Sequence, residues 1–221
     1  MISLRNIVFK YGKRVILRNI TTDIQDGVTY VIGPNGAGKT TLLKIAAGIY
    51  KPSSGEVIVD GINIWDVDEA KALEVRRRII YVHERPAVLR GTVLKNIVYG
   101  FKLRGVNDTG EVLRIVKPIA EEINVVELLW KNAGELSAGQ LQKVALVRAI
   151  ALRPRYLLLD EPFSHLDEES VKRVSYVLRR IVEDQGVCVV VASHIREAVE
   201  GLSPRVVMIR EGELVKVSPE P

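Results

Sequence analysis

Hydrophobic and polar residues alternate near the beginning of the chain. The apolar residues Ile2 and Leu4, and then Ile7 and Phe9, are each two positions apart, which predicts an antiparallel strand with one buried face. Similar short patterns predict further strands at about 15–23 and over Glu56–Asp60. We therefore expect an antiparallel β-subdomain at the N-terminal end of the chain.

Three later segments are apolar almost without interruption. Strands that are buried on both faces of a parallel sheet have this composition. These segments are Val28–Gly33, Tyr156–Asp160 and Val187–Ala192. In open parallel sheets ligands bind at the carboxyl ends of the strands, so we expect a site where these three segments end.

Helical patterns separate the apolar segments. The predicted core helices run from Lys39 to about Ala47, over Ser137–Leu152 and over Glu168–Asp184. Four further helical patterns fill the middle of the chain, over 68–78, 93–103, 112–122 and 125–131. Two short apolar stretches, 206–209 and 213–217, predict a terminal hairpin. The expected division is an α/β core at 1–65 and 154–221, with an inserted α-helical subdomain at about 66–153.

The composition is that of a folded globular protein. The 221 residues are 47% hydrophobic and 27% charged, and the net charge of +5 is scattered along the chain. No apolar stretch approaches the roughly 20 residues that span a bilayer, and residues 1–5 do not begin a secretory signal pattern. The single cysteine, Cys188, lies inside an apolar run and is interpreted as a buried thiol. These features favour a cytoplasmic protein.

Between the first buried strand and its helix, residues 33–41 read Gly-Pro-Asn-Gly-Ala-Gly-Lys-Thr-Thr. The pattern G-x-x-x-x-G-K-[ST] predicts a loop whose backbone N–H groups surround phosphate oxygens, as in P-loop NTPases. We expect Lys39 to contact the β- and γ-phosphates of ATP, Thr40 to bind Mg²⁺ and Thr41 to reach the α-phosphate. The candidate ATP-binding residues of this Gly-rich loop are Gly33, Pro34, Asn35, Gly36, Ala37, Gly38, Lys39, Thr40 and Thr41.

Two acidic residues end the second buried strand. Asp160 has the position of a Walker B aspartate and is the second candidate Mg²⁺ ligand. Glu161 follows directly, and its carboxylate is the candidate general base that polarises the attacking water. The alternative interpretation is a pair of acids that only caps a strand end.

Leu136-Ser137-Ala138-Gly139-Gln140, twenty residues before Asp160, resembles the signature sequence of ABC-transporter nucleotide-binding domains. The family form is Leu-Ser-Gly-Gly-Gln, so Ala138 replaces a glycine. This signature segment also fits a helix capping box made by Ser137 and Gln140. The resemblance implies an ATP-dependent dimer in which Ser137 and the Gly139 amide contact ATP bound to the second subunit.

Other positions match the same family. Tyr11 resembles the aromatic residue that stacks on adenine; the alternative is a strand aromatic in the core. His194 resembles the switch histidine that contacts the γ-phosphate. The family's D-loop corresponds to Ser164, His165, Leu166 and Asp167, with His165 where a small residue is usual.

The chain departs from the family at one catalytic position. The family has a glutamine that contacts Mg²⁺ and the attacking water, and the sequence Tyr81-Val-His-Glu84-Arg-Pro86 places Glu84 there. No shift of register supplies a glutamine, because the chain has glutamine only at 25, 140, 142 and 185. Glu84 keeps an oxygen ligand but adds charge. One hypothesis is slower hydrolysis than in Glu84→Gln; the other is simple replacement of the ligand.

The resemblance implies an ATPase subunit that powers transport through separate transmembrane permease subunits, on the inner face of the cell membrane. The segment 85–100 resembles the loop and helix start with which such an ATPase contacts its permease. The same segment is similar to that of ATPases from importers of small oxyanions. An exporter ATPase is one alternative. A second alternative is a soluble ABC ATPase that acts on DNA or ribosomes; such proteins carry coiled-coil insertions, tandem domains or basic extensions, which the printed sequence lacks, so no nucleic-acid partner is expected.

Overall fold

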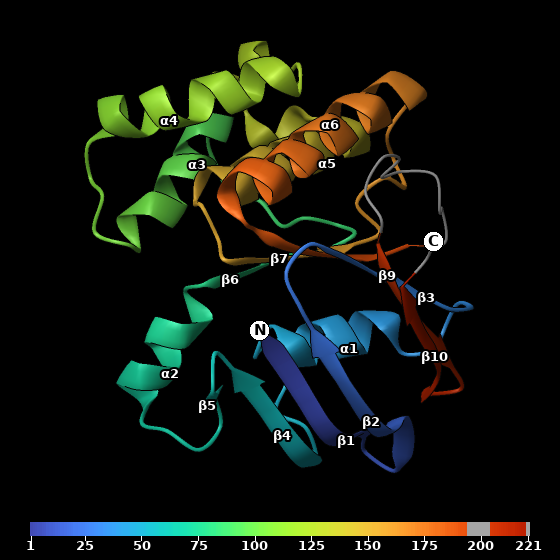
Figure 1. Ribbon diagram of the computed structural model, residues 1–221. Coiled ribbons are helices and arrows are strands. Elements are labelled where there is room, and N and C mark those ends of the chain that lie inside the picture. The colour runs from blue at the N-terminus through green and yellow to red at the C-terminus, as the bar shows by residue number, and fades with distance from the viewer. Residues whose placement is uncertain (194–203, 220–221) are drawn as a thin grey trace.

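The computed structural model describes residues 1–193 and 204–219 (Figure 1). The helices are α1 (Lys39–Ala46), α2 (Glu69–Arg76), α3 (Val93–Lys102), α4 (Thr109–Glu122), α5 (Ala138–Ala151) and α6 (Glu168–Gln185). The strands are β1 (Ile2–Tyr11), β2 (Arg14–Ile24), β3 (Val28–Ile32), β4 (Ser54–Val59), β5 (Ile62–Asn63), β6 (Ile79–Val82), β7 (Tyr156–Asp160), β8 (Cys188–Ala192), β9 (Arg205–Arg210) and β10 (Glu213–Pro219). Residues Val126–Leu128, inside the fourth helical pattern of the middle segment, form only a short 3-10 helix.

The larger sheet has six strands in the order β10-β9-β3-β8-β7-β6. The pairs β9–β3, β3–β8, β8–β7 and β7–β6 are parallel, and β10 adds an antiparallel edge. The prediction that the three apolar segments form a parallel sheet is therefore confirmed.

Strand β6 corrects the interpretation of the middle of the chain. Residues Ile79–Val82 lie inside the range predicted to be helical, yet they pair in parallel with β7 as an edge strand of the larger sheet. A run of four apolar or aromatic residues next to a helix has no period that distinguishes strand from helix. These residues form a strand because they pair with β7, and the local sequence does not predict that pairing.

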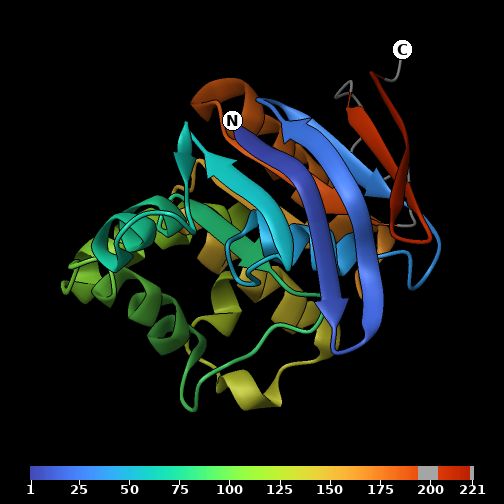
Figure 2. The same ribbon diagram turned by 90° about the horizontal axis from the view of Figure 1, so that it is seen from below.

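The smaller sheet is antiparallel, with the order β2-β1-β4-β5. Strand β1 pairs with β2 on one side and with β4 on the other. This sheet is the predicted N-terminal antiparallel part, and Figure 2 shows it in front of α1.

The two faces of the larger sheet are covered by different elements. Helices α3–α6 lie over one face, while α1 lies between the other face and the antiparallel sheet (Figure 1). Strand β7 alternates between two hydrophobic clusters: Leu157 and Leu159 face the helices, and Tyr156 and Leu158 face α1. This double burial explains the continuous apolar sequence, and the same alternation turns Asp160 toward α1.

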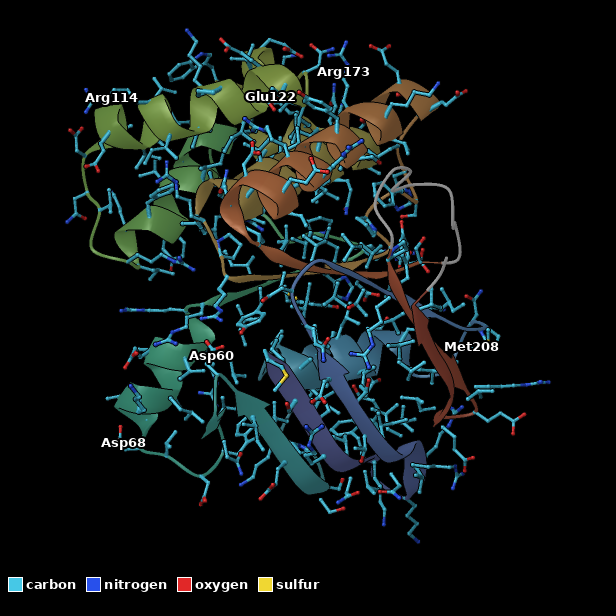
Figure 3. The ribbon with its side chains drawn as sticks, in the orientation of Figure 1. Asp60, Asp68, Arg114, Glu122, Arg173 and Met208 are labelled. Atoms are coloured by element: carbon cyan, nitrogen blue, oxygen red, sulfur yellow. The ribbon has the colours of Figure 1, made fainter. Side chains whose placement is uncertain are left out.

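The helices α3–α6 form one packed layer. Helix α5 contacts both α3 and α4, and α4 also contacts α6. An ion pair between Glu122 on α4 and Arg180 on α6, 3.0 Å long, joins these two helices; Glu122 is labelled in Figure 3. Within the described residues, no helix is both long and apolar enough to cross a bilayer.

Candidate functional site

The Gly-rich loop connects β3 to α1. Gly36 and Gly38 have φ angles of 78° and 107°, in the region that favours glycine, and a Cβ on Gly38 would lie 2.6 Å from Leu17 Cδ2. Gly38 precedes the first residue of α1, and no side chain caps this helix start. The amide N–H groups and the positive end of the helix dipole therefore favour an anion at the loop.

Lys39 is folded into the loop. Its side chain is buried, and Nζ donates hydrogen bonds to the carbonyl oxygens of Gly33 (2.7 Å) and Pro34 (3.3 Å). Within the part of the chain that the structure describes, no carboxylate forms an ion pair with this ammonium. A buried cation without an anionic partner favours a bound anion such as phosphate.

Asp160 connects the end of β7 to the loop. Thr40 Oγ1 donates a hydrogen bond to Asp160 Oδ1 (3.0 Å), and the Tyr81 hydroxyl donates to Oδ2 (2.8 Å). The Asp160 residue is only 2% exposed. Burial and the charge of Asp160 raise the pKa of Tyr81 far above its usual value, so its hydroxyl stays protonated and remains a donor.

The pair of Thr40 and Asp160 fits a Mg²⁺ ion held together with a nucleotide. Magnesium prefers hard oxygen ligands, and with phosphates and water it needs only one or two from the protein. Among the described residues, no three His, Cys, Asp or Glu side chains lie close enough to hold a metal together. Glu84, Asp160 and Glu161 therefore do not form a three-carboxylate metal site on their own.

A cavity of about 330 Å³ adjoins the Gly-rich loop. Its size is at the lower end of the range for small-molecule sites. The lining residues come from β1 and β2, from the loop and α1, and from the ends of β6 and β7: Tyr11, Arg14, Ile16, Asn35, Gly36, Gly38, Lys39, Thr40, Thr41, Glu84 and Glu161. Most of the predicted ATP-binding residues thus meet at one cavity, together with the two acidic side chains that sequence analysis placed in catalysis.

Tyr11 lies at the rim of this cavity, not in the core. It is 49% exposed, and its ring contacts those of Phe9 and Tyr50 edge-on, with centroids 4.9 and 5.9 Å away. Burial of the hydroxyl and its hydrogen bond with Tyr50 raise the pKa of Tyr11 to about 12. A planar, exposed ring at the entrance is suited to stacking against a base.

The backbone of Glu161 is unusual. Its φ of 45° is uncommon for a residue other than glycine, and its N–H donates to the Ala192 carbonyl (2.8 Å), which joins the ends of β7 and β8. The Ser193 hydroxyl donates to Glu161 Oε2 (3.4 Å). Strained backbone held by its neighbours is concentrated at functional sites, so Glu161 is a candidate for an active role.

The signature segment begins α5 with the predicted capping box. Gln140 N donates to Ser137 Oγ (3.3 Å), and Ser137 N donates to Gln140 Oε1 (3.1 Å). Ser137 and Ala138 are exposed, and no residue from Leu136 to Gln140 lines the cavity beside the Gly-rich loop. The structure therefore separates this segment from the candidate residues that line the cavity of the same chain.

The D-loop segment, Ser164–Asp167, packs against the signature segment. A Cβ on Gly139 would lie 2.5 Å from the carbonyl oxygen of His165. At its beginning, the Ser164 hydroxyl donates to the Glu161 carbonyl (3.0 Å), and at its end Asp167 caps α6 by accepting from Ser170 N (2.7 Å). His194, the remaining predicted residue, lies outside the described residues.

Sequence analysis assigned no role to Tyr81, Arg14 or Ile16. Arg14 and Ile16 reach the cavity because β2 pairs with β1 beside the loop. The hydrogen bond from Tyr81 to Asp160 depends on the pairing of β6 with β7. These contacts arise from the pairing of strands that are distant in the sequence, so local sequence motifs do not predict them.

Comparisons with known proteins identify relatives of this chain. A family model described as "ABC transporter" matches residues 17–164. The chain is 33% identical over 217 residues to a putative ABC transporter ATP-binding protein of Pyrococcus horikoshii, covering 97% of this chain and 82% of that protein. It is 31% identical over 231 residues to a probable anion import ATP-binding protein of Haloferax volcanii, covering 99% and 80% of the two chains. Among solved structures, the ATP-binding cassette MJ0796, a dimer in a post-hydrolysis state with ADP and Pi, matches with a TM-score of 0.89 at 28% identity, over 99% of this chain and 98% of that one.

Proposed function

Because the chain belongs to the ABC transporter family of ATP-binding subunits and is an ATPase of that family, we propose that it powers the import of a small oxyanion through separate membrane subunits. The observation that carries the ATPase part is the meeting of Lys39, the Thr40–Asp160 pair and Glu161 at one site. Each of these groups suits one task in phosphoryl transfer.

Each residue of the site has a role in ATP hydrolysis that fits its chemistry. The amides of the Gly-rich loop and Lys39 bind the phosphates, while Thr40 and Asp160 hold Mg²⁺, which neutralises charge on the phosphate oxygens. Glu161, at the end of β7, orients the attacking water and accepts its proton. Glu84 lines the same cavity and brings a second carboxylate close to the phosphates.

A second copy completes the site. Ser137 and Ala138 are exposed and lie away from the cavity of their own chain, while Ser137 N and the following amides open a capped helix. Such a helix start binds anions well. Each signature segment then faces the ATP held by the other subunit, and two ATP molecules lie at the interface. The dimeric cassette among the similar structures supports this arrangement.

A groove on the helical layer is the place where we expect the membrane subunit to bind. It includes exposed apolar side chains, namely Leu89 (50%), Tyr99 (50%) and Trp130 (62%). The buried Asn96 fixes its rim, because its amide accepts from Leu89 N (2.6 Å) and donates to the Leu89 carbonyl (3.0 Å). A rigid groove with exposed aromatic residues suits an amphipathic helix from a partner.

Import is tested by measuring uptake in cells that lack this chain. Wild type, Lys39→Ala and the exposed-site control Lys51→Ala are supplied in turn, and uptake of labelled molybdate, sulfate and phosphate is followed separately. Uptake of one oxyanion with wild type and Lys51→Ala, but not with Lys39→Ala, supports the proposal. ATP-dependent efflux favours an exporter, and ATPase activity stimulated by nucleic acid in the absence of membrane partners favours the soluble alternative.

The similarity to a probable anion import ATP-binding protein supports the choice of substrate class. If none of the three oxyanions is taken up while another solute is, the ATPase assignment stands and the oxyanion part fails. If purified wild type does not hydrolyse ATP, the catalytic part fails.

A further inference from the structure

Tyr81 and Asp160 lie on the same face of neighbouring strands. In the parallel pairing of β6 with β7, Tyr81 is the partner of Leu158. Asp160 lies two residues further along β7, so its side chain points to the same face as that of Leu158. The Tyr81 hydroxyl can therefore reach Asp160 Oδ2, to which it donates at 2.8 Å.

The tyrosine is held in this position by its surroundings. Its ring packs against the hydrophobic cluster on the α1 side of the sheet and meets the His83 ring edge-on, with centroids 6.0 Å apart. The hydroxyl is the donor in this hydrogen bond, because the Asp160 carboxylate oxygen can only accept. One oxygen of Asp160 is thereby occupied by Tyr81, and the other receives Thr40.

We propose that Tyr81 is a positioning residue for the magnesium site, which holds the Asp160 carboxylate so that Oδ1 faces Thr40 and the metal of a bound nucleotide. The inference rests on the proposed function, since it concerns how this chain binds Mg²⁺ with ATP. A carboxylate held at both oxygens needs no reorganisation when the metal arrives. Without the tyrosine hydroxyl, the buried carboxylate loses one of the two hydrogen bonds that fix its orientation.

Strand β7 offers a matched control at its other end. The hydroxyl of Tyr156, the first residue of β7, donates to Asp60. Asp60 also accepts from Arg78 Nη1 (3.1 Å), and Figure 3 shows it beside α2. Neither Asp60 nor Tyr156 lines the nucleotide cavity. Tyr156→Phe therefore removes the same atom from the same type of hydrogen bond, on the strand next to that of Tyr81, without touching the proposed metal site.

The experiment compares wild type, Tyr81→Phe and Tyr156→Phe as purified full chains. A fluorescent ATP analogue is bound first with EDTA and then at increasing MgCl₂ concentrations, and thermal unfolding is recorded for all three proteins. For Tyr81→Phe we expect the half-saturating Mg²⁺ concentration to rise about three- to tenfold, with unchanged binding in EDTA. For Tyr156→Phe we expect the wild-type Mg²⁺ dependence, with a lower unfolding temperature.

The outcomes separate three possibilities. A magnesium dependence that is unchanged in Tyr81→Phe, or shifted equally in both variants, overturns the positioning role. Weaker binding of Tyr81→Phe in EDTA also overturns it, because the defect then lies in the nucleotide contacts. If wild type binds the analogue no better with Mg²⁺ than without, the Mg²⁺ site at Thr40 and Asp160 is contradicted, and with it that part of the proposed function.

Discussion

Gly139 offers a direct test of the contact between the signature segment and the D-loop segment. Gly139 lies in the first turn of α5, where alanine is favoured over glycine by up to about 1 kcal/mol. The Cβ of an alanine would lie 2.5 Å from the His165 carbonyl oxygen, closer than real Cβ contacts allow. The obstacle is backbone, so the D-loop segment must move. We expect this overpacking to cost about 1–3 kcal/mol and to outweigh the gain in helix propensity.

The control is Gly100→Ala, in the interior of α3. A Cβ there would lie 3.2 Å from Leu152 Cδ1, the tip of a flexible side chain. Alanine has the same advantage in helix propensity here, but the Leu152 side chain can rotate away from the new methyl group. We therefore expect Gly100→Ala to be as stable as wild type or more stable.

Urea unfolding of both variants, followed by circular dichroism, gives the free energies of unfolding. Gly139→Ala should also lose ATPase activity because His165 and Ser137 shift together. If Gly139→Ala instead stabilises the chain as Gly100→Ala does, the His165 carbonyl yields freely and the packing argument is refuted.

Two further changes test the site, and a third tests the core around Cys188. Glu84→Gln removes a negative charge beside the phosphates and should raise steady-state ATPase activity roughly threefold or more; an equal or lower rate would show that Glu84 only replaces a ligand. Glu161→Gln should bind ATP without hydrolysing it and accumulate as a dimer, so light scattering that reports a monomer with ATP and Mg²⁺ counts against the shared site. Burial raises the pKa of the Cys188 thiol to about 12. An unfolded thiol has a pKa of about 8.5, so the folded state binds the proton more tightly, and stability should fall as the pH rises from about 9 towards 12. At pH 8 a thiol reagent should label Cys188 only after unfolding.

The features that the sequence predicted well are local ones. The Gly-rich loop, the capping box of Ser137 and Gln140, and the buried strand that ends at Asp160 are each encoded within a few neighbouring residues. Their patterns depend on backbone geometry and on burial of both strand faces, so they can be recognised without knowing the rest of the fold.

The features that escaped prediction depend on pairing between distant segments. Strand β6 is too short to show a period, and it is a strand because β7 offers it an edge. The role of Tyr81 follows from that pairing, and the requirement for glycine at 139 follows from the approach of His165. The sequence identified Glu84 as a departure from its family, and the structure adds that Glu84 and Glu161 line one cavity without forming a metal site with Asp160.

The D-loop segment connects two places that serve different ATP molecules in the proposed dimer. It begins at the backbone of Glu161, which belongs to the chain's own site, and its carbonyl at His165 rests on Gly139, which faces the partner's ATP. The Ser164 backbone N–H also donates to the Glu161 carbonyl (3.3 Å), and the His165 contact is made by a backbone carbonyl, so rotation of a side chain does not release the segment at either end. A displacement of Glu161 during hydrolysis therefore reaches the signature segment through a short and stiff path. In a symmetric pair this path exists twice, and we expect the two sites to respond to each other's nucleotide.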